Sequence, residues 1–137
     1  MNTLITGAGS GIGRATALRL AKRSHICVAD KNGASAAAVV KEIEAAGGKA
    51  TAYEVNVLDG DAVRAMVAKA EAAAPIDALF NNAGISVRTE IKDVSGDEWD
   101  LMLNTHARGM FFVAQAVLRN MVPRKAGGIV QTSSDFA

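Results

Sequence analysis

The sequence contains a single cysteine, Cys27, and its 137 residues include only two prolines. One cysteine excludes an intramolecular disulfide and therefore a disulfide-stapled secreted domain. Fifteen Lys and Arg residues against fourteen Asp and Glu leave a net charge of +1, which gives no field to hold nucleic acid or an anionic membrane. No apolar run approaches the roughly 18 residues of a membrane span, and the first residues do not resemble a signal peptide. We therefore expect a cytoplasmic protein that binds neither nucleic acid nor membrane.

Half of the residues are hydrophobic, and the length corresponds to about one domain with one core. Short apolar runs alternate with longer segments in which apolar residues recur every three or four positions, and this order indicates strands alternating with helices. The predicted strands are Asn2 to Thr6, His25 to Asp30, Lys49 to Val57, Ile76 to Asn81 and Gly128 to Ser133. The predicted helices are Gly11 to Ser24, Ala34 to Ala46, Asp61 to Ala73 and Asp97 to Met121. Such alternation predicts a doubly wound α/β domain, a parallel sheet of about five strands with helices on both faces.

Residues that begin and end helices support these boundaries. Ser95 and Glu98 have the spacing of a capping box at the start of the last helix. Gly47 stands where a glycine would close the second helix, and Pro75 and Pro123 are expected to stop the third and fourth helices.

The first predicted strand leads into a glycine-rich segment, Thr6-Gly7-Ala8-Gly9-Ser10-Gly11-Ile12-Gly13, which then opens a helix. Glycines at 7, 11 and 13 permit a tight turn and the close approach of a pyrophosphate to the helix N-terminus. A turn without any ligand is the alternative. Asp30, at the end of the second strand, favours a dinucleotide site because a carboxylate there binds the hydroxyls of the adenine ribose.

The Thr-Gly-x-x-x-Gly-Ile-Gly spacing resembles that of the short-chain dehydrogenase/reductase family, and two further segments share the resemblance. Asn81-Asn82-Ala83-Gly84 resembles the family's signature after the fourth strand, and Gly127 to Ser134 resembles its fifth strand. The resemblance implies a Rossmann-type fold and hydride transfer between NAD and a small secondary alcohol or ketone. It assigns cofactor contacts to Gly7, Ser10, Gly11, Ile12, Gly13, Asp30, Asn56, Val57, Asn82, Ala83 and Gly84.

Two positions depart from the family pattern. Asn56 stands where the family usually has the aspartate that accepts from adenine, and its amide oxygen can still accept. His106 stands three residues before Gly109, in the place of the family's helix-four asparagine, whereas Asn104 is out of register by two. The resemblance implies that His106 holds a water or relays a proton. The alternative is a histidine that only packs in its helix.

The resemblance also identifies Ser134 as the serine that hydrogen-bonds the substrate oxygen. The family's Tyr-x-x-x-Lys pair has no counterpart, because Tyr53 is the only tyrosine and no lysine lies four residues after it. We therefore expect residues 1–137 to be the amino-terminal, NAD-binding portion of a single-domain family member, ending before that motif. The alternative is a dinucleotide-binding module without catalysis, or an inactive fragment.

Asp30 predicts NAD over NADP, because a 2′-phosphate would meet its carboxylate and Ser10 provides no compensating arginine. Arg14 is interpreted either as a surface charge or as a phosphate ligand. The apolar face that includes Phe111, Phe112 and Val117 is expected to be core or subunit contact, which favours a homodimer or homotetramer. No metal site is predicted, because His25 has no second ligand at a suitable spacing.

Overall fold

The structure, a computed structural model, describes residues 1–133 and consists of five strands, five α-helices, a 3₁₀ turn and a π-helical segment. In chain order the elements are β1 (Asn2–Thr6), α1 (Gly11–Leu20), β2 (His25–Asp30), α2 (Gly33–Ala45), β3 (Ala50–Glu54), α3 (Gly60–Ala73), β4 (Ala78–Asn81), a 3₁₀ turn (Ile91–Asp93), α4 (Gly96–Leu103), the π segment (Asn104–Gly109), α5 (Met110–Arg124) and β5 (Gly128–Gln131). All strand pairs are parallel, in the order β3-β2-β1-β4-β5, so the predicted α/β architecture is confirmed.

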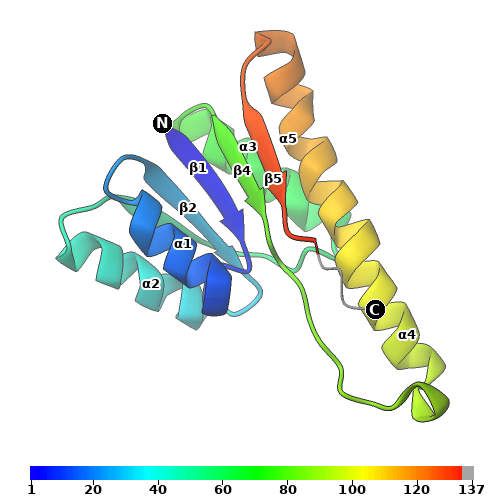
Figure 1. Cartoon of the computed structure of the whole chain (residues 1–137). Coiled ribbons are helices and arrows are strands. Elements are labelled where there is room, and N and C mark those ends of the chain that lie inside the picture. Colours follow the sequence, from blue (N-terminus) through cyan, green and yellow to red (C-terminus); the bar gives the residue numbers. More distant parts are fainter. Residues whose placement is uncertain (134–137) are drawn as a thin grey trace.

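Two hydrophobic cores lie on opposite faces of this sheet. Ile5 and Val28 pack with α1 and α2 on one face, whereas Leu4 and Cys27 pack with α3 and α5 on the other. Figure 1 shows α1 and α2 together on one side of the strands and α5 on the other. Consecutive strand residues face opposite sides. The central strands therefore read as continuous apolar runs, as expected for a sheet that is covered on both faces.

Three strands are shorter than the sequence predicted, and the register explains one end of each. β3 ends at Glu54 rather than Val57, because β2, its one neighbour among the described strands, ends at the paired residue Asp30. β5 ends at Gln131 rather than Ser133, because its partner β4 ends at Asn81. β4 begins at Ala78 rather than Ile76, since its pairing with β1 starts there.

Two helix predictions were also wrong at their ends. α1 stops at Leu20 rather than Ser24, because the Ser24 hydroxyl bonds Thr3 Oγ1 at 2.7 Å and the carbonyl of Met1 at 3.0 Å and so belongs to the sheet. Pro123 lies inside α5 instead of following it. A proline in the last turn removes only one N–H donor, and the helix ends immediately afterwards at Lys125, whose φ is 52°.

The predicted helix Asp97 to Met121 is divided by the π segment, which carries His106. The predicted caps are confirmed. Ser95 and Glu98 form a capping box, and Gly47, with φ of 80°, follows α2 and donates its N–H to Glu44. Within residues 1–133, no helix combines the length and the hydropathy that crossing a membrane requires.

Candidate functional site

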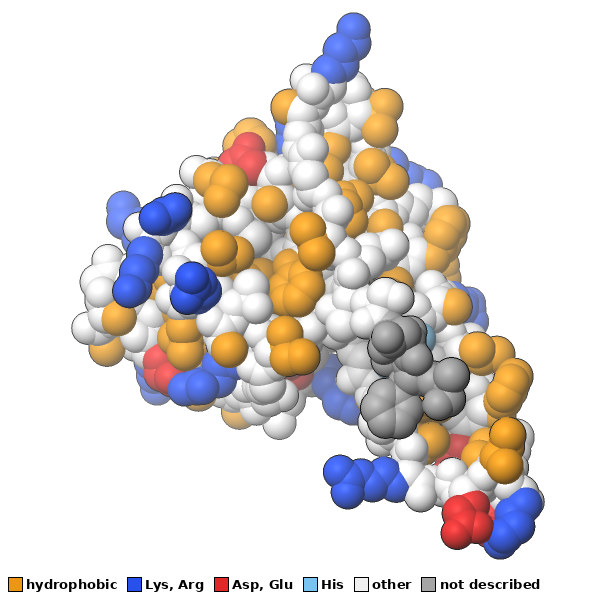
Figure 2. Space-filling view, in the orientation of Figure 1, with side chains coloured by type: hydrophobic (Ala, Val, Ile, Leu, Met, Phe, Trp, Pro, Cys, Tyr) orange, Lys and Arg blue, Asp and Glu red, His pale blue; other side chains and the backbone are white. Residues whose placement is uncertain are grey.

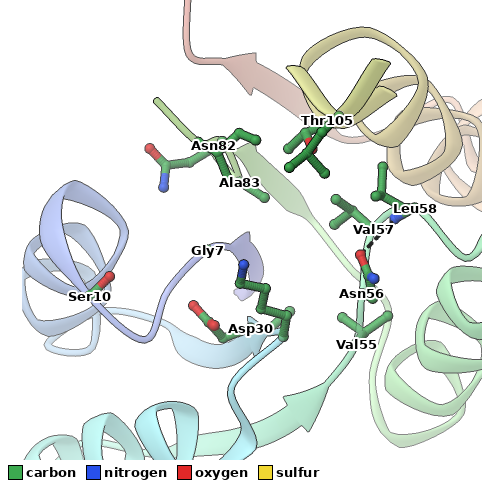
Figure 3. Close-up of a pocket in the computed structure, with 15 residues that line it drawn as sticks. Gly7, Ser10, Asp30, Val55, Asn56, Val57, Leu58, Asn82, Ala83 and Thr105 are labelled. Carbon is green, nitrogen blue, oxygen red and sulfur yellow. Dashed lines mark hydrogen bonds between the residues drawn. The ribbon is translucent and has the colours of Figure 1, made fainter. Parts of the chain in front are cut away.

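A cavity of about 380 Å³ lies at the carboxyl ends of the strands, beside the reversal of strand order between β1 and β4. Doubly wound sheets bind ligands at such a switch point. Figure 3 shows Ser10 and Asp30 on one side of this space and Asn56 and Leu58 on the other. The cavity is lined by Gly7, Ser10, Ala29, Asp30, Lys31, Val55, Asn56, Val57, Leu58, Asn82, Ala83, Gly84, Ile85, Leu101 and Thr105.

The turn between β1 and α1 needs glycine for two reasons. Gly7 and Gly11 have φ of 63° and 52°, in the left-handed region that strains other residues. At Gly13 an added Cβ would lie 2.2 Å from the carbonyl oxygen of Gly7, so α1 packs directly on the turn. An added Cβ at Gly11 would meet no atom within 4 Å. The turn is therefore closed on its inner side and open beside the start of α1.

The first turn of α1 has no capping side chain. Ser10, at the N-cap, makes no side-chain hydrogen bond to the helix, whereas the N-cap residues of α2, α3 and α4 each accept a backbone N–H. First-turn N–H groups have no acceptor inside a helix, and the helix dipole adds positive potential there. The first turn also contains no acidic residue. This helix start therefore presents free donors to an anion.

Asp30 holds the glycine turn in place while it lines the cavity. Its Oδ2 accepts from the N–H of Gly9 at 2.9 Å, and its Oδ1 accepts from the N–H of Asn32 at 2.9 Å. Each carboxylate oxygen has further lone-pair capacity, so both can still accept from a ligand hydroxyl. The carboxylate thus links the turn, the end of β2 and the cavity.

The segment after β4 is tied to the end of β1 through one hydroxyl. Thr6 Oγ1 accepts from the N–H of Asn82 at 2.9 Å and from that of Ala83 at 3.0 Å. The Asn82 side chain donates to the carbonyl of Thr6 at 3.2 Å and accepts from the hydroxyl of Thr132 at 3.1 Å. Asn81, fully buried, donates to the carbonyl of Met110 at 2.8 Å. These bonds fix Asn82 and Ala83 as a rigid wall of the cavity.

His106 contacts the continuation of the same wall. Its Nε2 lies 2.7 Å from the carbonyl oxygen and 3.3 Å from the backbone nitrogen of Ile85. A Cβ added at Gly84 would lie 2.7 Å from the imidazole Cε1, so a larger residue at position 84 would displace the ring. The ring therefore contacts a segment that lies 21 residues away in sequence, in addition to its own helix.

Asn56 and Val57 form the wall on the β3 side. The Asn56 side-chain oxygen accepts from the N–H of Leu58 at 3.1 Å, which orients the amide (Figure 3). Val57 packs closely against the π segment, since a Cβ at Gly109 would lie 2.8 Å from its Cγ2. Asn56 thus lines the cavity with its side-chain oxygen bonded to the backbone of Leu58.

Several residues singled out in the sequence lie away from the cavity. Arg14 donates through Nε and Nη2 to the two carboxylate oxygens of Glu42 in α2, so the surface-charge interpretation fits its position. Tyr53 is 7% exposed and packs in the core, and burial raises the pKa of its phenol. Cys27 is also buried, and burial raises its pKa from 9.0 to about 11, as expected for an unreactive thiol. Ser134 lies outside the described residues.

The cavity also includes residues that the sequence analysis missed. Lys31 could have been found, because it directly follows Asp30 at the end of β2. Ile85 and Leu58 likewise follow motifs that were recognised. Leu101 and Thr105 come from α4 and the π segment, and no local pattern marks their approach to the sheet.

Comparisons with known proteins agree with this arrangement. The short chain dehydrogenase family model matches residues 1–137. The chain is 38% identical over 133 residues to 3-oxoacyl-acyl-carrier-protein reductase FabG of Thermotoga maritima, covering 96% of this chain and 54% of the relative. It is 40% identical to gluconate 5-dehydrogenase of Gluconobacter oxydans, covering 96% of this chain and 52% of that relative.

A solved short-chain type dehydrogenase/reductase from Mycobacterium marinum superposes with a TM-score of 0.92 at 34% identity, over 97% of this chain and 55% of that one. A 3-ketoacyl-ACP reductase from Sinorhizobium meliloti gives a TM-score of 0.91 at 36% identity, over 98% of this chain and 54% of that one. The chain thus spans about half the length of the relatives it matches. It belongs to the short chain dehydrogenase family.

Proposed function

We propose that the cavity binds NAD and that the chain is the cofactor-binding portion of an oxidoreductase. The reaction would transfer a hydride between a secondary alcohol or ketone and the nicotinamide, which supplies the redox chemistry when bound. The observation that carries this proposal is the uncapped start of α1 beside the glycine turn, with Asp30 across from it. Those groups suit a pyrophosphate and a ribose respectively.

The residues divide by the part of the dinucleotide that each would hold. Backbone N–H groups of Gly11, Ile12 and Gly13 would bind the pyrophosphate, together with Ser10 and Gly7. Asp30 would accept from the ribose hydroxyls, and Asn56 with Val57 would contact the adenine. The wall of Asn82, Ala83 and Gly84 would lie against the nicotinamide half.

Asp30 supports NAD over NADP, because a 2′-phosphate would be repelled by a carboxylate that is itself fixed by two backbone N–H groups. Among residues 1–133, Lys31 is the one cation that lines this cavity, and its charge could oppose the preference for NAD. The preference therefore depends on which of the two neighbouring side chains faces the ribose when the cofactor is bound.

The proposed catalytic residues are Ser134, which would hydrogen-bond the substrate oxygen, and His106, which would hold a water or relay a proton. A second candidate function is dinucleotide binding without turnover. The position of Tyr53 favours it for this chain, because the only tyrosine is buried in β3 and does not line the cavity. Binding and turnover are therefore tested separately.

We also propose that the chain forms homodimers or homotetramers in the cytoplasm through α5. Val113 and Val117 of this helix are buried against the core, but Phe111 is 58% and Val122 is 66% exposed. Between them runs an apolar groove on the outer side of α5, lined by Phe111, Ala114, Gln115, Leu118, Arg119, Val122 and Pro123. Figure 2 shows hydrophobic side chains gathered along this side of the molecule. Apolar grooves of this kind are typical of subunit contacts.

Isothermal calorimetry with NAD and NADP tests the cofactor proposal. Hydrogen bonds to a charged group contribute about 1.5 to 3 kcal/mol, so Asp30→Ala should weaken NAD binding roughly tenfold to a hundredfold and narrow the gap to NADP. Asp100→Ala, on the exposed side of α4, is the matched control and should leave both affinities unchanged. Equal or tighter binding of NADP to the unmodified chain would overturn the preference. NADH formation from a panel of secondary alcohols then distinguishes turnover from binding alone.

A further inference from the structure

The chain has two histidines, and the structure places them in opposite hydrogen-bonding environments. His25 begins β2, at the amino end of the sheet, and both of its ring nitrogens have side-chain partners. His106 lies in the π segment near the carboxyl end and bonds backbone atoms through Nε2. A neutral imidazole carries one donor and one acceptor, so the partners decide which nitrogen is protonated.

The partners of His25 select the tautomer with the proton on Nδ1. The Asn2 amide donates through Nδ2 to the carbonyl of Ala74 at 2.9 Å, which turns its oxygen toward the histidine. That oxygen can only accept, and it lies 2.9 Å from His25 Nδ1. Nε2 then accepts from the hydroxyl of Thr51 at 3.0 Å. Both nitrogens are satisfied in one tautomer.

The partners of His106 select the opposite tautomer. Nε2 lies 2.7 Å from an oxygen that can only accept and 3.3 Å from an N–H that can only donate, both belonging to Ile85. An unprotonated Nε2 would place two acceptors 2.7 Å apart, inside hydrogen-bond distance with no proton between them. A protonated Nε2 leaves two donors 3.3 Å apart, which is the milder conflict.

We propose that Ile85 locks His106 in the tautomer with the proton on Nε2, so that the two nitrogens have separate tasks. Nε2 positions the Gly84–Ile85 wall of the cavity, and Nδ1 stays an unprotonated acceptor. Gly84 contributes to the lock, because a Cβ there would displace the ring. His106 is therefore a positioning residue for this wall whether or not the chain turns over a substrate.

The consequence for chemistry rests on the proposed function. If His106 holds a water or relays a proton, then Nδ1 is the nitrogen that accepts, since the proton on Nε2 is already donated to Ile85. The side chain is exposed, so water reaches it. If the chain shows no turnover, the tautomer assignment of His106 still stands. If His106 has the other tautomer, the proposal that the cavity binds NAD still stands.

The test is a two-bond ¹⁵N–¹H correlation spectrum of the uniformly ¹⁵N-labelled chain at pH 8.5, with assignment through His25→Gln and His106→Gln. We expect at least a tenfold excess of the Nε2-protonated form at His106 and the Nδ1-protonated form at His25. His25 is thus an internal control in the same sample. A protonated Nδ1 at His106, or two forms within tenfold of each other, would overturn the lock.

Gly84→Ala tests the lock without changing the histidine. The variant should reduce the excess of the Nε2-protonated tautomer at His106 below tenfold. The spectrum of His25 should stay unchanged, and this also shows that the sheet has folded. Gly96→Ala is the matched control, because a Cβ there would meet no atom within 4 Å, and it should change neither histidine. An unaltered His106 spectrum in a folded Gly84→Ala variant would contradict the role of Gly84.

Discussion

The amino and carboxyl ends of the sheet differ in whether their polar groups have hydrogen-bond partners within the chain. At the amino end, Asn2 bonds Ala74 and His25, Thr3 bonds Ser24, and the N–H of Asn2 donates to Asp77, so each of these groups has a protein partner. At the carboxyl end, α1 begins without a side-chain cap and Asp30 lines an open cavity. The amino end thus pairs these polar groups within the chain, whereas the carboxyl end leaves the first-turn N–H groups of α1 without a capping side chain.

This difference separates stability from binding. A buried polar group with its hydrogen bonds made stabilises the folded chain, and removing its partner costs folding free energy. A free donor at a helix start contributes nothing to stability until an anion arrives. Substitutions at the amino end should therefore lower stability alone, whereas substitutions at the carboxyl end should lower NAD affinity, unless they also disturb packing.

The largest effect is expected where the carboxyl end is itself tightly packed. Gly13→Ala places a Cβ 2.2 Å from a backbone oxygen that cannot move without distorting the turn. We expect a loss of about 3 kcal/mol in the free energy of unfolding, the upper part of the range for an overpacked site, together with loss of NAD binding. Urea unfolding and calorimetry measure the two effects. Gly96→Ala should preserve both, and a Gly13→Ala chain of normal stability and affinity would refute the packing argument.

Asn2→Ala should affect the amino end alone. The substitution leaves the ring nitrogen of His25, the thiol of Cys27 and the carbonyl of Ala74 without their partner. We expect a loss of about 2 kcal/mol in the free energy of unfolding and an unchanged Kd for NAD. Asn120→Ala is the matched control, since among the described residues its amide makes one bond, of 3.4 Å, to a carbonyl of its own helix. A Kd raised tenfold by Asn2→Ala would show that the two ends are coupled.

Ser10→Asp should place a negative charge at the start of α1. We expect it to raise stability slightly and to lower NAD affinity. A carboxylate near the first turn of α1 stabilises the helix by about 0.5 kcal/mol through the helix dipole. The same charge repels a pyrophosphate, so NAD affinity should fall by about tenfold. Thermal unfolding and calorimetry on Ser10→Asp and Ser10→Asn separate charge from hydrogen bonding. Tighter NAD binding by the aspartate variant would contradict the anion site.

The sequence predicted the sheet and the glycine turn because their signals are local. The apolar run of β1, the glycines that follow it and Asp30 at the end of β2 each lie within one short segment. The capping box at Ser95 is equally local, and the structure confirms it. Strand ends were less predictable, because β3 and β5 stop where a neighbouring strand stops, and that neighbour is distant in sequence.

The details of the site depended on contacts that no local pattern encodes. The apolar periodicity predicted one continuous helix, whereas the structure divides it by the π segment. The contacts of this segment with Val57 and Ile85 join residues that are distant in sequence. Arg14 follows the glycine motif in the sequence but is bonded to Glu42 from another helix. Leu101 and Thr105 line the cavity from α4 and the π segment, which are separated from β4 by a long loop.

The most direct test of the central claim is a titration of the ¹⁵N-labelled chain with NAD, followed by backbone amide shifts. We predict progressive shifts of Gly11, Ile12 and Gly13 at the start of α1 and of Ala83 after β4. The amides of His25 and Asp77, at the amino end, should stay unchanged at saturation. Shifts confined to the amino end, or no shifts at millimolar NAD, would contradict the assignment of the carboxyl end as the cofactor site.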